Sequence, residues 1–200
     1  MRQAASTATL LIAGLTLSTY AIPSWHFHKA IRVYSDPEAY RVYAAILPDN
    51  PGYKYSSSTL IIREGTRYYY SDSCFEPGTK YEALVDSAIA DYRRVNRVPW
   101  KLARLFPISK PYQFAPESDF AGFMWKTASP LGEYIRNHPD FAGYIELSAV
   151  GFNQTKTVAV VYTAYKGAGL SAGWDVVILR KEKGDWKELI GRGLGCFAKS

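Results

Sequence analysis

The sequence is poor in cysteine and histidine, and this scarcity excludes several classes of protein. The chain has 200 residues, of which two are cysteine and three are histidine. Two cysteines are too few for a disulfide-rich miniprotein or for a zinc module built on cysteine thiolates. Two of the histidines, His26 and His28, lie close together, but they are near the N-terminus, where chains are often poorly ordered. We therefore predict no metal site.

Long hydrophobic runs are also absent, apart from one short stretch near the N-terminus. Residues 4–21 carry no charge and follow Arg2, and their apolar centre at Thr9–Leu15 is much shorter than the roughly 20 residues of a membrane-spanning helix. One early cation, a short apolar run and small residues before Ala21 are typical of a secretory signal peptide. The alternative is an ordinary N-terminal helix. We expect residues 1–21 to be a signal peptide and residues 22–200 to be one domain, periplasmic or extracellular, without a membrane span.

Export would place Cys74 and Cys196 in an oxidising compartment, where a disulfide bond is allowed. Two cysteines permit a single intramolecular pairing. Whether they bond depends on the distance between their Cα atoms, which the sequence does not give. A disulfide and two separate thiols both remain open.

The composition is that of a folded protein with a moderate basic excess. Apolar residues make up 48% and charged residues 21%, with 24 Lys and Arg against 18 Asp and Glu, so that the net charge is +6. These values exclude collagen-like and disordered chains. Much of the excess lies in one group, which is Arg93, Arg94, Arg97, Lys101 and Arg104. No nucleic-acid-binding motif accompanies it, so we predict a solvated surface and no specific nucleic-acid partner.

The first part of the chain has the pattern of helices with strands between them. Asp36 and Pro37 are typical of an N-cap and a first helical position, which predicts a helix that continues to Leu47. The segment 58–63 has the composition of a strand. Residues 82–95 predict a second helix, whose apolar face is formed by Tyr81, Leu84, Val85, Ala88 and Tyr92. A short helical turn is expected over 100–106, an edge-like segment over 107–116, and one or two helices over 118–137.

From Gly143 the pattern changes to strands separated by short turns. Four strands are predicted, at 144–152, 157–165, 174–180 and 186–190. Four strands at this spacing with no helix between them form an antiparallel meander. Helices followed by strands indicate an α+β fold. We expect the helices to pack on one face of a curved antiparallel sheet of four to six strands that includes this meander.

This C-terminal half carries a pattern of small and aromatic residues at fixed spacing. It consists of Ser148-x-Val-Gly-Phe-Asn153, Thr157-x-Ala-x-Val-Tyr162, Gly169-Leu-x-x-Gly173 and Trp186. The pattern resembles that of a group of mostly exported bacterial proteins that have no established activity. The resemblance implies export and a similar fold, and it implies no catalytic residue.

The sequence carries no motif for a cofactor. Gly167, Gly169 and Gly173 lead into a predicted strand rather than a helix N-terminus, which favours a hairpin over a phosphate loop. A hydrolytic set could be assembled from Ser148, His138 and Asp140, but Ser148 lies in strand sequence and lacks the glycines of a nucleophile elbow. We therefore name no catalytic residue and expect no cofactor.

A curved sheet backed by helices leaves a concavity, which is a natural place for a pocket. The residues expected to line it are Trp125, Tyr162, Trp174 and Trp186. The function predicted is that of an exported domain at the cell envelope that binds a small ligand or a protein partner without catalysis. The alternative is a small hydrolase or transferase with its site in the same concavity.

Overall fold

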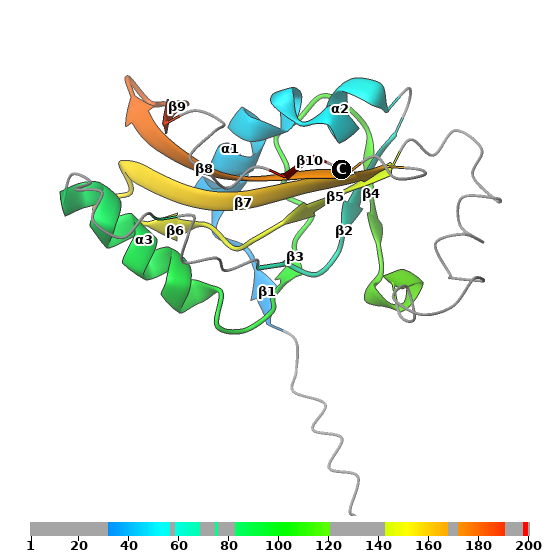
Figure 1. Cartoon of the computed structure of the whole chain (residues 1–200), viewed down its shortest axis with the longest axis horizontal. Coiled ribbons are helices and arrows are strands. Elements are labelled where there is room, and N and C mark those ends of the chain that lie inside the picture. The colour runs from blue at the N-terminus through cyan, green and yellow to red at the C-terminus, as the bar shows by residue number, and fades with distance from the viewer. Residues whose placement is uncertain are drawn as a thin grey trace, which may run out of the picture.

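The computed structural model describes residues 32–56, 59–68, 75, 83–120, 143–167, 172–190 and 198–199. These residues form an α+β fold, as predicted, with helices in the first half of the chain and most strands in the second (Figure 1). The helices are α1 (Pro37–Ile46), α2 (Pro51–Tyr55) and α3 (Ala83–Val95), with 3-10 turns η1 (Leu47–Asp49) and η3 (Glu117–Phe120).

The main sheet is mixed. Its strand order is β10-β8-β7-β5-β2-β4, with β6 paired to β7 and β9 paired to β8. Its strands are β2 (Leu60–Arg63), β4 (Tyr112–Ala115), β5 (Gly143–Leu147), β6 (Gly151–Phe152), β7 (Val158–Gly167), β8 (Ala172–Glu182), β9 (Asp185–Ile190) and β10 (Ala198–Lys199). Among the described strands, β4 forms one edge and β9 and β10 the other, so the sheet is open.

The predicted antiparallel meander is present, and two strands extend it. β5, β7, β8 and β9 pair in antiparallel succession. β2 then joins β5 in parallel, and β4 joins β2 in parallel. The prediction of an antiparallel sheet of four to six strands is therefore too small, and the sheet is mixed, because β2 and β4 join it in parallel from segments whose partners lie far away in the sequence. The predicted strand 144–152 is also divided, into β5 and β6.

The prediction that helices cover one face of the sheet is wrong, because they cover both. α1 packs with Ala159 and Val161 of β7, whereas α3 packs with Val158 and Val160 of the same strand. Side chains alternate between the two faces of a strand, so a strand with both sets buried needs a layer on each side. In Figure 1, α1 and α2 lie above β7 and β8, and α3 lies below them.

α1 and α3 begin and pack for reasons that are largely local. The Asp36 side chain accepts a hydrogen bond from the backbone N–H of Glu38, and Pro37 occupies the first turn, as predicted for α1. α3 buries Val85, Ala88, Ile89 and Tyr92, at the spacing of one helical face. Leu84, which was predicted to belong to this face, is 48% exposed.

A small second sheet joins the chain ahead of α1 to the segment after α3. β1 (Val33–Tyr34) pairs in parallel with β3 (Lys101–Leu102). The predicted helical turn over 100–106 is therefore wrong, since tertiary pairing makes part of it a strand. β4, flanked by Pro111 and Pro116, confirms the edge-like character of 107–116.

A buried arginine ties the parallel part of the sheet together. Arg63 of β2 donates to Glu146 of β5 over 2.7 Å and to both carboxylate oxygens of Glu117 over 2.8 Å. Such bidentate, charge-assisted contacts are among the stronger hydrogen bonds in proteins. They fix η3 against β2 and β5.

Several predictions fall on residues outside the described part of the chain. These are the signal peptide 1–21, Cys74, Cys196, Trp125, His138 and most of the helical region 118–137. Among the described residues, no helix has the length and apolar character needed to cross a membrane.

Candidate functional site

The break between β5 and β6 organises the surroundings of the candidate site. Residues 148–150 leave the strand pattern at this break, and side chains from other elements bond the backbone of residues 148–152. The hydroxyl of Tyr34 accepts from the Val150 N–H and donates to the Val150 carbonyl, both over 3.1 Å. The Tyr43 hydroxyl donates to the Ser148 carbonyl over 2.7 Å. Buried backbone groups need such partners, so the break is a built feature of the fold.

α3 lies very close to this segment. A Cβ atom on Gly151 would lie 2.2 Å from the backbone nitrogen of Tyr92, so only glycine fits there. The Asn96 side chain accepts from the Ala149 N–H and donates to the Ala149 carbonyl, each over 2.9 Å. The carboxylate of Asp91 accepts from the Phe152 N–H over 2.9 Å. The close approach at Tyr92 and the bond from Asp91 thus fix β6 against α3, and Asn96, the residue after the helix, fixes the strand break beside it.

Asn153 shapes the turn that follows β6. Its side-chain oxygen accepts from the backbone N–H groups of Thr157 and Val158, and its amide nitrogen donates to the hydroxyls of Thr155 and Thr157. Together with Ser148 and Gly151, it gives the Ser-x-Val-Gly-Phe-Asn pattern a role in holding the strand break and the hairpin.

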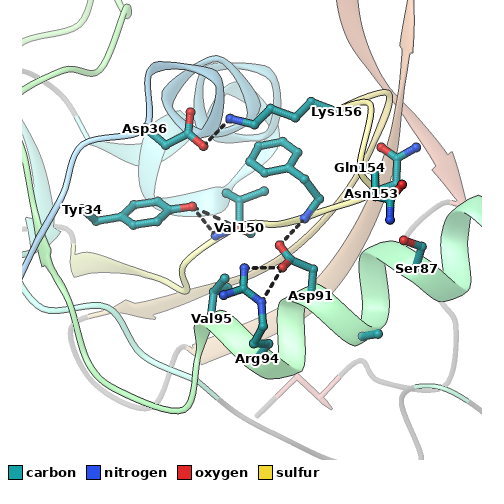
Figure 2. Close-up of a pocket in the computed structure, with 12 residues that line it drawn as sticks. Tyr34, Asp36, Ser87, Asp91, Arg94, Val95, Val150, Asn153, Gln154 and Lys156 are labelled. Atoms are coloured by element: carbon teal, nitrogen blue, oxygen red, sulfur yellow. Dashed lines mark hydrogen bonds and ion pairs between the residues drawn. The ribbon is translucent and has the colours of Figure 1, made fainter.

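An open groove lies between α3, the strand break and the N-terminus of α1 (Figure 2). Its volume is about 500 Å³. Its lining consists of Tyr34, Asp36, Ser87, Ala90, Asp91, Arg94, Val95, Val150, Phe152, Asn153, Gln154 and Lys156. This is the size of a site for a small molecule or a few side chains of a partner.

Two ion pairs lie on opposite sides of the groove. On one side, Lys156 Nζ lies 2.7 Å from Asp36 Oδ2. On the other, Arg94 Nε donates to Asp91 Oδ1 over 2.9 Å. Figure 2 shows the Asp36 pair beside the helix α1 and the Asp91 pair on α3, with Val150 between them.

Tyr34 forms part of the floor and is held in its neutral form. Burial raises the pKa of its phenol well above the usual value of 10, and the hydrogen bond to Val150 only partly offsets this. Its ring therefore serves as a packing and hydrogen-bonding group at neutral pH. It does not supply a phenolate.

The arrangement is suited to binding by shape, charge and aromatic contact. Ser148, the serine of the candidate hydrolytic set, is fully buried; its hydroxyl donates to the Ala149 carbonyl and accepts from the Tyr162 N–H. A nucleophile needs access to substrate and a base within hydrogen-bond reach. Ser148 is instead a structural residue of the strand break. Among the described residues, no group of three or more His, Cys, Asp and Glu side chains is placed to hold a metal ion.

The residues expected to line the concavity are divided between the two faces of the sheet. Tyr162 and Trp174 lie together on the face of α3, with ring centroids 6.4 Å apart. Trp186 lies in the core on the face of α1, and its indole N–H donates to Glu38 over 2.7 Å. Trp125 is outside the described residues. None of the three described residues lines the groove, so a binding role for them stays a prediction.

Most of the basic group, which begins in the last turn of α3, is engaged in local contacts. Arg94 pairs with Asp91, and Lys101 Nζ lies 2.8 Å from Glu64. The guanidinium groups of Arg93 and Arg104 lie over the rings of Phe75 and Phe114. This agrees with the interpretation of an ordinary surface.

The groove was not predicted from the sequence, although Asp36 was noted as an N-cap, Arg94 as part of the basic group and Asn153 as the end of the Ser-x-Val-Gly-Phe-Asn pattern. The groove brings together residues from three regions, 34–36, 87–95 and 150–156. One signal was available, since the Ser-x-Val-Gly-Phe-Asn pattern ends on the groove at Phe152 and Asn153. Comparison of the chain with protein families, with curated proteins and with solved structures found no match.

Proposed function

We propose that this protein is an exported, envelope-associated α+β domain that binds a small ligand or a protein partner without catalysing a reaction. The observation that carries the proposal is the groove between α3, the strand break and the N-terminus of α1. Its walls are fixed to the backbone by Tyr34, Asp91 and Asn96. Pre-organisation of this kind lowers the entropic cost of binding.

The pairing of the polar groups in the groove favours binding over hydrolysis or group transfer. Each of its two carboxylates is paired with a cation, and each also accepts a backbone N–H. Charge pairs of this kind orient a ligand, whereas acid–base catalysis needs a group poised to exchange a proton with substrate. The sheet concavity remains the place for the alternative, a small hydrolase or transferase.

Site-specific photo-crosslinking tests whether the groove is a binding site. A photoreactive amino acid replaces Gln154, which is exposed on the groove, and in a matched variant it replaces Lys183, which is exposed on the turn between β8 and β9. After irradiation in the native host, the Gln154 variant is expected to gain mass from a ligand or partner and the Lys183 variant is not. Equal labelling at both positions, or none at Gln154, would contradict the proposal.

Export is tested separately by fractionation and intact-mass analysis. The expected product is outside the cytoplasm and begins after Ala21. A mature protein that still begins at Met1 would contradict the signal-peptide hypothesis. The same spectrum, recorded before and after reduction, decides between the two states of Cys74 and Cys196, because a disulfide gains the mass of two hydrogens.

A further inference from the structure

We propose that the groove recognises organic cations with primary ammonium groups, such as alkyl diamines, and that Lys156 and Arg94 hold the place of this ligand when it is absent. The inference rests on the proposed binding function and names the ligand class of the same site. It follows from a difference between the acids and the bases that line the groove.

The two carboxylates are the fixed charges. Asp36 accepts the Glu38 N–H over 3.1 Å and so caps α1, while Asp91 accepts the Phe152 N–H over 2.9 Å and so joins α3 to β6. Their side chains are 29% and 22% exposed. Neither carboxylate can turn away from the groove without leaving a backbone N–H unbonded.

The two cations are the mobile charges. The side chains of Lys156 and Arg94 are 48% and 68% exposed, and they form ion pairs with Asp36 and Asp91 respectively. Exposed ion pairs of this kind contribute little to stability, because both partners are well solvated when apart. Lys156 and Arg94 can therefore leave the groove for solvent at small cost.

The surroundings of the Lys156 ammonium group show how the ammonium group of a ligand would be held. Its Nζ lies 2.7 Å from Asp36 Oδ2 and 5.3 Å from the centre of the Phe152 ring. A carboxylate together with an aromatic face is a favourable site for an ammonium ion, through a charge-assisted hydrogen bond and a cation–π contact. A diamine would place its second ammonium at Asp91, across the groove.

An anionic ligand fits this arrangement less well. It would draw Lys156 and Arg94 towards itself and leave the fixed carboxylates of Asp36 and Asp91 beside it, so that like charges would face each other. The chain carries a net charge of +6, which favours anions at long range. Beyond a Debye length of about 8–10 Å at physiological salt this field is largely screened, so the contacts inside the groove decide which ligand binds.

The test is titration calorimetry of the full mature chain with 1,5-diaminopentane, using pentane-1,5-diol and glutarate as a neutral and an anionic probe of similar length. The wild type is expected to bind the diamine only. Asp36→Asn should weaken binding at least tenfold while the helix cap is retained, because asparagine is also a good N-cap. Lys156→Met should strengthen diamine binding several-fold, since it removes the competing internal ammonium.

Lys183→Met is the matched control, because Lys183 is also an exposed turn lysine with positive φ, 52° against 50° for Lys156. It should leave diamine binding unchanged. Glutarate binding that is lost in Lys156→Met would overturn the cation assignment and leave the proposed binding function standing. If no probe binds while Gln154 still crosslinks specifically, the ligand class is wrong. If no probe binds and crosslinking at Gln154 also fails, both the ligand class and the proposed binding function are wrong.

Discussion

α1 and α3 cover opposite faces of the same two strands, and they are attached there by different kinds of contact. Both helices bury an apolar face, and α1 is held in addition by the ends of charged and polar side chains, as where Glu38 accepts from Lys181 Nζ and from the Trp186 indole, both over 2.7 Å. α3 is held by close backbone approach at Gly151 and by bonds from Asn96 and Asp91 to backbone groups. The contacts of Glu38 that hold α1 depend on its charge and therefore on pH. The contacts that hold α3 depend on the small size of Gly151 and on hydrogen bonds to backbone groups.

The difference bears on where the groove could form. Contacts between side-chain ends tolerate small shifts, whereas an N–H group in contact with a fixed acceptor does not. The groove lies where both kinds meet, between the N-cap of α1 and the middle of α3. One of its walls is therefore set by backbone geometry, and the other carries an exposed ion pair between Asp36 and Lys156.

The largest expected effect is that of Gly151→Ala. The new Cβ would meet the backbone of Tyr92, which cannot move without the helix, so we expect a loss of at least about 3 kcal/mol in the free energy of unfolding, measured with urea. Gly184→Ala is the control, since its Cβ would meet nothing within 4 Å and only the positive φ is strained, at about 1–2 kcal/mol. Equal losses would show that close approach is not what holds α3.

The next effect is expected from Asn96→Ala. It leaves the N–H and the carbonyl of Ala149 without their partners in a buried place, which should cost about 2–3 kcal/mol in urea unfolding. Arg97→Ala, an exposed change at the same end of α3, should stay within about 0.5 kcal/mol. A loss for Asn96→Ala no larger than that for Arg97→Ala would contradict the backbone attachment.

The stability that α1 gains from Glu38 is expected to decrease at acid pH. Burial raises the pKa of Glu38, but the hydrogen bonds from Lys181 and Trp186 outweigh it, so that the pKa lies below the usual 4.5. The unfolded chain then binds this proton more tightly than the folded protein. The stabilisation is present above pH 4.5 and is lost as the pH falls through the lower pKa of the folded state.

Urea unfolding of wild type and Glu38→Gln, compared from about pH 7 down to about pH 3, measures this dependence. The advantage of the wild type should shrink on the acid side. A difference that stays constant over the whole range would mean that Glu38 acts through packing alone. Asn96→Ala, which has no titrating group, serves as the control and should show a constant difference.

The smallest effect is expected from Lys156→Met. Its ion pair with Asp36 is half exposed, so the free energy of unfolding should change by less than about 1 kcal/mol. A larger loss would mean that Lys156 holds α1 in place, and it would remove the mobility that the proposed ligand exchange needs.

The sequence predicts the parts of this fold that are decided locally. Asp36 and Pro37 are enough to start α1, because the cap and the fixed φ of proline act within one turn. For α3 the helix was predicted but its face was shifted, with Leu84 placed inside in place of Ile89. Amphipathic spacing defines an apolar stripe only to within about one residue when small and aromatic side chains border it.

The remaining features depend on contacts between distant segments. Apart from Gly151, residues 144–152 have the composition of a continuous strand, and the break is held by Tyr34 and by the approach of α3. The parallel pairing of β2 with β5 joins residues more than 80 positions apart, as at Ile61 and Tyr144. The groove was out of reach for the same reason, because its ion pair joins Asp36 and Lys156, which are 120 positions apart.

The attachment of α1 also determines the order in which the chain can complete its fold. The partners of Glu38 lie 143 and 148 positions further along the chain. Until β8 and β9 exist, Glu38 of α1 has neither of these partners, although Tyr40 and Tyr43 can already pack against Phe106. Contacts of such long range slow folding and leave apolar surface exposed in the meantime. The attachment of α1 through Glu38 can therefore form only after β8 and β9 have been added to the sheet. Removal of β8 and β9 from the C-terminal part of the chain should destabilise α1.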